Sequence, residues 1–169
     1  MNTSVREFIW SQFEAAIDTL ENAINSCPDS LWGDRTKHHE YWYMVFHTLF
    51  WLDYYLSESH TDFHPPAPFG LEEMDPAGVL PPRVYSKEEM LAYLNHGREK
   101  ARATVAAMSD DTFKRRYDFG KVSLSIPELY LYNMRHVQHH AAQLNLILRQ
   151  QANIGSRWVF QGKTAHARS

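Results

Sequence analysis

The sequence of 169 residues contains only one cysteine, Cys27. A single thiol cannot form a disulfide within the chain, and it cannot supply the several thiolates of a structural zinc site. Any metal ion bound by this chain must therefore be held by nitrogen and oxygen atoms. Cys27 also follows the end of a predicted helix, and a lone thiol is more often a small core residue than a nucleophile.

The chain also lacks an excess of charge of either sign. Its formal net charge is −3, from 17 lysines and arginines and 20 acidic residues that are scattered along the sequence. A nucleic-acid-binding domain would instead show a basic patch or stripe. We therefore expect no nucleic-acid partner.

Long apolar runs are missing as well. The longest are too short and too broken to span a bilayer, and residues 1–7 lack the basic start and apolar stretch of a secretory signal. We therefore expect a soluble cytoplasmic protein with no membrane partner. The length suits one domain over residues 1–169, and the sequence contains no internal repeat.

Helical periodicity is the strongest pattern in the sequence. Apolar residues recur at spacings of three and four and predict helices over about 4–26, 38–57, 87–108 and 126–150. Three of these segments open with a serine followed three residues later by a glutamate, the capping-box pattern. The pairs are Ser4 and Glu7, Ser86 and Glu89, and Ser125 and Glu128. We therefore expect an all-α fold.

Residues 58–84 break this periodicity. Six of the eight prolines lie there, so we expect a long irregular loop between the second and third helices, of the kind that often forms a lid or binding element. Residues 110–122 should form a second connection. Residues 155–169 should form a partly ordered tail, with Trp158 and Phe160 packed back onto the helices. Four helices with one long crossover are typical of a four-helix bundle.

The fourth predicted helix contains a cluster of histidines. Side chains four residues apart share one helix face, so His136 and His140 can direct ring nitrogens at one metal ion. Bundles place metal sites between facing helices, and His47 lies on an apolar stripe of the second helix. A buried imidazole nitrogen without a partner costs about 1–3 kcal/mol, and a metal ion would supply that partner. We therefore predict a three-histidine metal site.

Histidine spacing alone is weak evidence, because the chain has ten histidines. His60 and His64 form a second pair at the same spacing, but this pair runs directly into Pro65 and Pro66 and is not expected to bind a metal by design. His38 and His39 are expected to be solvated near the start of the second helix.

Several neighbours could line the pocket or support the ligands. The candidates are Tyr43, Trp51, Asn133, His139 and Gln143. Four of them also have a simpler role: Tyr43 and Trp51 as core aromatics, Gln143 as the partner of a buried backbone group, and His139 as a surface residue. Asn133 lies near the ligands and could orient an anionic substrate.

Two charged residues have the same ambiguity. Arg135 could orient an anionic substrate or could lie on the surface. Glu40, two turns before His47, could be a distant acid or base or a solvated residue at the helix start.

Four segments in chain order carry a resemblance to a known family. They are FHTLF at 46–50, DYYL at 53–56, LPPRVYSKEEM at 80–90 and YNMRHVQHHAAQL at 132–144. Together they resemble the DinB-like superfamily over nearly the whole chain. The resemblance implies an up-down-down-up four-helix bundle that holds a divalent metal ion, zinc or nickel. The ligands would be one histidine of the second helix and a His-x-x-x-His pair of the fourth, here His47, His136 and His140. It implies no DNA-repair role.

The resemblance also implies a reaction class and an assembly. Characterised relatives are thiol-dependent transferases and isomerases that use bacillithiol, mycothiol or glutathione, and many relatives form homodimers. Three imidazoles leave open positions on the ion, where a thiol or a water molecule could be activated. We therefore expect transfer of a low-molecular-weight thiol to a small-molecule electrophile.

Two alternatives remain open at this point, a metal-dependent hydrolase and a non-enzymatic, metal-stabilised binding protein. The sequence specifies neither the native metal nor the substrate, because three imidazoles suit zinc, nickel, copper and iron alike.

Overall fold

The structure is a computed structural model that describes residues 3–36, 40–58, 61–119 and 122–166. It is mostly helical, as the sequence predicts. Four long helices are present: α1 (Thr3–Ser26), α3 (Tyr41–Tyr55), α4 (Lys87–Ala106) and α5 (Ile126–Ala152). The shorter elements are α2 (Asp29–Trp32), η1 (Glu72–Met74), η2 (Thr112–Lys114), β1 (Arg116–Phe119), β2 (Val122–Ser125) and α6 (Lys163–His166).

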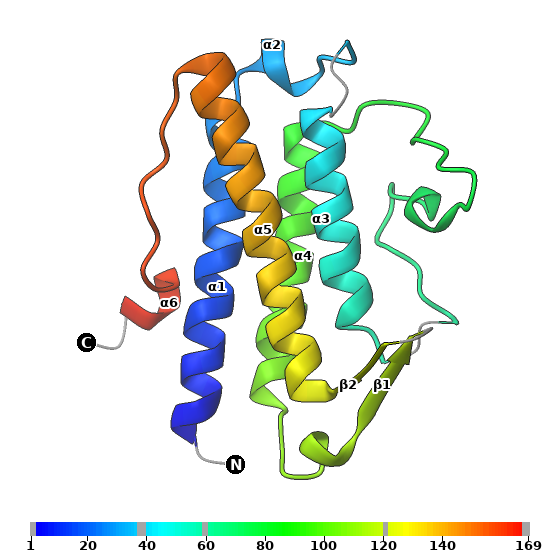
Figure 1. The fold of residues 1–169 in the computed structure, drawn as a ribbon, viewed down its shortest axis with the longest axis vertical. Helices are drawn as coiled ribbons and strands as arrows, with labels where there is room; N and C mark the ends of the chain where they lie inside the picture. Colours follow the sequence, from blue (N-terminus) through cyan, green and yellow to red (C-terminus); the bar gives the residue numbers. More distant parts are fainter. Residues whose placement is uncertain (1–2, 37–39, 59–60, 120–121, 167–169) are drawn as a thin grey trace.

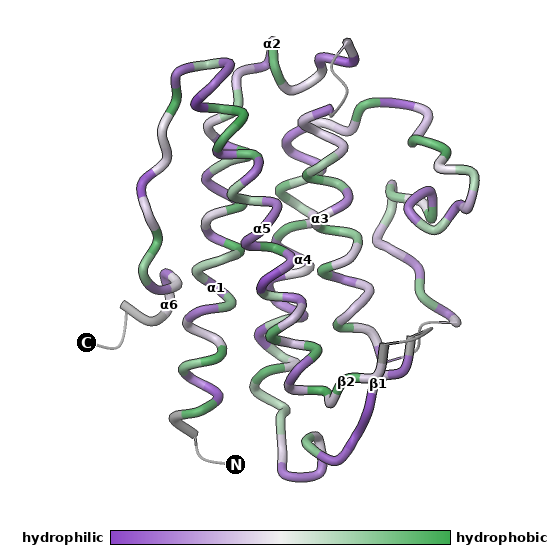
Figure 2. The backbone as a smooth tube through the Cα atoms, in the orientation of Figure 1, coloured by the Kyte–Doolittle hydropathy of each residue, from purple (hydrophilic) through white to green (hydrophobic). Residues whose placement is uncertain are grey.

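The four long helices lie side by side (Figure 1). Both α1 and α3 pack against α4 and α5. In the view of Figure 1, α1 and α5 run upward and α3 and α4 run downward. Figure 2 shows apolar and hydrophilic residues interleaved along these helices, the pattern of elements that bury one face and expose the other. Among the described residues, none of the helices has the length and hydrophobicity needed to cross a membrane.

Two of the three expected capping boxes are confirmed. The hydroxyl oxygens of Ser86 and Ser125 accept hydrogen bonds from the backbone amides of Glu89 and Glu128, and the two glutamates accept bonds from the serine amides in return. The third expectation is wrong, because Ser4 lies inside α1 rather than in front of it. Helix α3 is shorter than predicted, and His38 and His39 lie outside the described residues.

The loop between α3 and α4 is anchored by aromatic packing. Phe69 stacks on Tyr93 of α4 with ring centroids 4.5 Å apart, and lies 4.7 Å from the Tyr85 ring and 5.9 Å from the Phe46 ring. Phe63 is buried as well. Because these rings join the core, the loop is held against the helices, and η1 is positioned beside α3.

The connection before α5 contains structure that the periodicity did not predict. Strands β1 and β2 pair as an antiparallel hairpin in which Arg116 lies opposite Ser125 and Tyr117 opposite Leu124. The Arg116 guanidinium also donates hydrogen bonds to the hydroxyl and carbonyl oxygens of Ser123, at 2.9 and 2.8 Å. Strands of four residues are too short to produce a clear alternation of apolar and polar residues.

The C-terminal segment packs differently from the prediction. Trp158 and Phe160 are 68% and 77% exposed, so the expectation that they pack back onto the helices is wrong. The segment is instead held by polar contacts to α1. The amide of Lys163 donates to the Asp18 carboxylate at 3.0 Å, and the amide of Thr164 donates to the Glu14 carboxylate at 3.1 Å.

Candidate metal centre

Three imidazole rings meet between α3 and α5. One nitrogen from each of His47, His136 and His140 lies within 4.8 Å of the others. The Nε2 atoms of His47 and His136 are 3.4 Å apart. Two nitrogens bound to one tetrahedral zinc ion, each at about 2.0–2.1 Å, would be separated by about 3.3 Å. The spacing of these two rings therefore fits a shared ion.

In two of the three rings, a hydrogen bond determines which nitrogen is free to bind a metal. The Nδ1 atom of His47 lies 2.6 Å from Oε2 of Glu73, and Nδ1 of His140 lies 2.7 Å from Oε1 of Gln143. Both oxygens are acceptors, so each Nδ1 carries the proton and donates. The lone pair of each ring is then on Nε2, which is how most metal-binding histidines are oriented.

Burial keeps the α5 histidines in the form that a metal ion requires. Burial, followed by the nearby rings of His140 and His47, lowers the pKa of His136 to about 3. The pKa of His140 is also lowered, by burial first and then by the rings of His47 and His139. Both imidazoles are therefore neutral at pH 7, and only neutral imidazole binds a metal. The buried Nδ1 atom of His136 has no hydrogen-bond partner among the described residues.

Glu73 is the site residue that the sequence did not reveal. Its side chain is 4% exposed, and besides His47 it accepts a hydrogen bond from Nε1 of Trp51 at 2.9 Å. Burial alone would raise the pKa of the carboxyl, but hydrogen bonds from His47 and Tyr43 outweigh it and lower the pKa. Glu73 lies in η1, within the Pro-rich loop, where helical spacing cannot predict its neighbours. The length of that loop was the only available clue.

The five pocket candidates from the sequence differ in how they lie relative to the three histidines. Tyr43 and Trp51 reach the site through Glu73, and Gln143 contacts His140 directly. His139 is exposed, with its ring 5.1 Å from the His140 ring. Asn133 is fully buried and donates to the carbonyl oxygen of Leu52 at 3.0 Å, so it links α5 to α3.

For the remaining candidates that the structure describes, no contact with the three rings is recorded. Arg135 and His64 are exposed, and His60 lies outside the described residues. The Glu40 carboxylate accepts a hydrogen bond from Trp42 at the start of α3 and contacts Arg35. Cys27 is 2% exposed, and burial raises its pKa to about 12.

The family model of the DinB superfamily matches residues 12–144. This span covers more than three quarters of the chain and includes all three histidines and Glu73. Neither the curated proteins nor the solved structures contain a match to this chain.

Proposed function

The chain belongs to the DinB superfamily, and on that premise we propose that His47, His136 and His140 bind one divalent metal ion, zinc or nickel. The observation that carries this proposal is the convergence of three imidazoles, two of which have their outer nitrogens held by Glu73 and Gln143. Metal-binding histidines commonly donate their second nitrogen to an acceptor of this kind. The directions of the long helices in Figure 1 support the up-down-down-up bundle of this family.

The bound ion serves catalysis rather than folding. All three histidines are only partly buried, and the His47 side chain is 31% exposed, so solvent and small molecules can reach the site. Structural metal sites, by contrast, are closed and fully coordinated by the protein. The core beside the site is also filled by large apolar side chains without the help of an ion.

The proposed reaction is transfer of a low-molecular-weight thiol to a small-molecule electrophile. A metal ion bound here would lower the pKa of a thiol and hold the thiolate at neutral pH. The protein's own residues prepare that position. Glu73 keeps the proton of His47 on Nδ1, Gln143 does the same for His140, and burial keeps His136 neutral.

Metal content tests the ligand assignment. Protein purified without a histidine tag should contain about one ion per chain by elemental analysis. His136→Ala should lose the ion, because two remaining imidazoles hold a divalent metal weakly. His139→Ala is the matched control, since His139 is the exposed neighbour of the site, and it should keep the ion. One metal ion per chain in the His136→Ala variant would contradict the assignment of His136 as a ligand.

A thiol panel tests the reaction. Metal-loaded and chelator-treated protein should be compared with bacillithiol, mycothiol, glutathione and cysteine, using monochlorobimane as the electrophile. Conjugation that depends on the metal is the expected result. No conjugation with any thiol, together with metal-dependent ester or amide cleavage, would favour a hydrolase. If the chelated protein instead unfolds, the ion is structural.

A further inference from the structure

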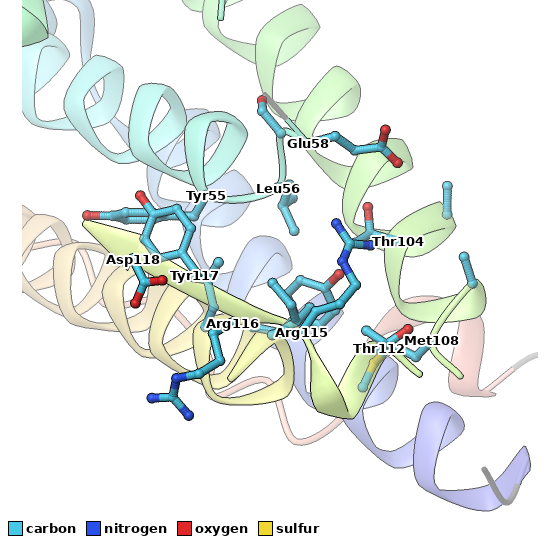
Figure 3. A pocket seen from close by; sticks show the side chains of 16 residues that line it. Tyr55, Leu56, Glu58, Thr104, Met108, Thr112, Arg115, Arg116, Tyr117 and Asp118 are labelled. Carbon is cyan, nitrogen blue, oxygen red and sulfur yellow. The ribbon is translucent and has the colours of Figure 1, made fainter. Parts of the chain in front are cut away.

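A cavity of about 600 Å³ lies at the end of the helices beside the hairpin. Its walls come from the end of α3, the last turns of α4, the hairpin and the first turns of α5 (Figure 3). The volume lies in the range of small-molecule binding sites. Leu56, Met108 and Leu129 are buried and form apolar parts of the lining.

Arg115 gives this cavity a cationic group, and the carboxylates of Glu58 and Asp118 belong to the same lining. Among the described residues, its guanidinium has no ion-pair or hydrogen-bond partner within reach. Figure 3 shows the side chain extending toward Thr104 of α4, across the cavity. The adjacent Arg116 differs, because its guanidinium is bound to Ser123 and points away from the cavity.

The charge and the lining together define a class of ligand. A planar guanidinium binds a carboxylate through two parallel hydrogen bonds, and the apolar part of this mixed lining suits an apolar or aromatic body. Glu58 lies at the rim of the same cavity. Its negative charge disfavours ligands with several negative charges, such as phosphate esters. A small molecule with a single carboxylate fits best.

Tyr55 connects this cavity to the three histidines. It lines the cavity, and its ring lies edge-on to the His136 ring with centroids 6.3 Å apart and planes at 86°. Tyr55 also packs against Tyr132 and Tyr117, at 5.3 and 6.3 Å between centroids. A ligand in the cavity is thus separated from the metal centre by one aromatic side chain.

We propose that this cavity is the subsite that binds the carboxylate of the small-molecule substrate, with Arg115 as the anchor and Tyr55 as the wall facing the metal centre. This assignment of substrate class rests on the proposed function. The carboxylate lies against Arg115, and the rest of the molecule extends along Tyr55 toward the histidines. Arg115 then sets specificity without taking part in the chemistry.

Binding to metal-free protein tests the subsite apart from the reaction. Phenylacetate and phenylacetamide have the same shape and differ in charge, and both can be titrated by NMR or calorimetry. We expect phenylacetate to bind about tenfold or more tightly than the amide, because a hydrogen bond to a charged group contributes that much. Arg115→Gln should remove the difference, whereas Arg102→Gln, an exposed arginine outside the cavity lining, should keep it.

Two results would overturn the subsite. One is equal or no binding of the two probes to the wild-type protein at millimolar concentration. The other is a preference for phenylacetate that persists in Arg115→Gln. Both are measured without metal, so they leave the three-histidine proposal standing. If conjugation is established, Arg115→Gln should raise KM for carboxylate-bearing substrates at unchanged metal content, while loss of the metal in this variant would contradict its assigned role.

Discussion

At the scale of single residues, Glu73 determines the orientation of the His47 ring and which of its nitrogens is free to bind a metal ion. Its carboxylate accepts the Nδ1 proton at 2.6 Å and is itself held by Trp51. A charged acceptor on the far side of the ring fixes the ring orientation and increases the electron density on Nε2. The orientation of His47 therefore depends on a loop residue that lies 26 positions away in the sequence.

We expect Glu73→Ala to weaken metal affinity by about 10–100-fold, the usual effect of removing such a partner. Glu73→Gln should have a smaller effect, because the amide oxygen can still accept the proton but carries no charge. The measurement is a competition titration against a fluorescent chelator. Glu72→Gln changes the neighbouring carboxylate and serves as the control, with affinity close to wild type. An unchanged affinity in Glu73→Ala would show that His47 is oriented without this bond.

Cys27 illustrates a residue that burial makes inert. Its raised pKa, about 12, means that the thiol stays protonated throughout the pH range in which the protein is assayed, and only the thiolate is a nucleophile. We expect no reaction of the native protein with Ellman's reagent at pH 8, and one equivalent after unfolding in guanidinium. The Cys27→Ala variant should retain the proposed conjugation. Rapid labelling of the folded protein would contradict the buried position.

At the scale of secondary-structure elements, the ends of the helices show which local patterns determine structure. Ser125 starts α5, the helix that carries His136 and His140, and its hydroxyl accepts a hydrogen bond from the Glu128 amide. This bond satisfies one of the amide groups that a helix start leaves without a partner.

We expect Ser125→Ala to lower the free energy of unfolding by about 1 kcal/mol, the typical value for losing such a cap. Ser30→Ala is the control, because Ser30 is an exposed residue within α2 and alanine favours helices. That variant should be neutral or slightly more stable. Urea unfolding of both variants gives the comparison, and equal destabilisation would argue against the capping role of Ser125.

The same elements show what the sequence could and could not predict. Helices α4 and α5 could be predicted from apolar spacing and from capping serines, because both patterns depend on residues close together in the chain. The meeting of His47 with the α5 pair could also be predicted, because each lies on an apolar stripe and facing helices of a bundle bring such stripes together. The hairpin, η1 and Glu73 could not be predicted, because they depend on contacts between distant segments of irregular chain. The tail was predicted from its aromatic residues, whereas it is held by its backbone amides.

At the scale of the whole molecule, the geometry of the candidate metal centre depends on packing some distance from it. Phe69 joins the core beside Tyr93, and this anchors the loop that carries Glu73. Figure 1 shows this loop and the C-terminal segment on opposite sides of the helices. The loop holds Glu73 against His47, whereas the C-terminal segment packs against α1. The two segments should therefore be separable by mutation.

At Gly162 the backbone of the C-terminal segment lies directly against α1. The Gly162 amide donates to the carbonyl oxygen of Ser11 at 3.0 Å, and a Cβ atom added there would lie 2.2 Å from a Glu14 carboxylate oxygen and 2.4 Å from the Glu14 Cβ. The contact with Glu14 Cβ cannot be relieved by turning a flexible side-chain end. Alanine at 162 must therefore displace the segment, and Glu14 and Asp18, both 1% exposed, would lose the amide donors of Thr164 and Lys163, whereas Asp18 would keep its ion pair with Arg98.

We therefore expect Gly162→Ala to destabilise the protein by about 1–3 kcal/mol, the cost of leaving a buried acceptor without its donor. The variant should also become sensitive to proteolysis near its C-terminus. Gly33→Ala is the matched control, because nothing lies within 4 Å of its Cβ position, and it should unfold like the wild type. Metal content should stay the same in both variants, since the histidines and Glu73 lie elsewhere. Wild-type stability in Gly162→Ala would mean that the buried carboxylates of α1 do not depend on the C-terminal segment.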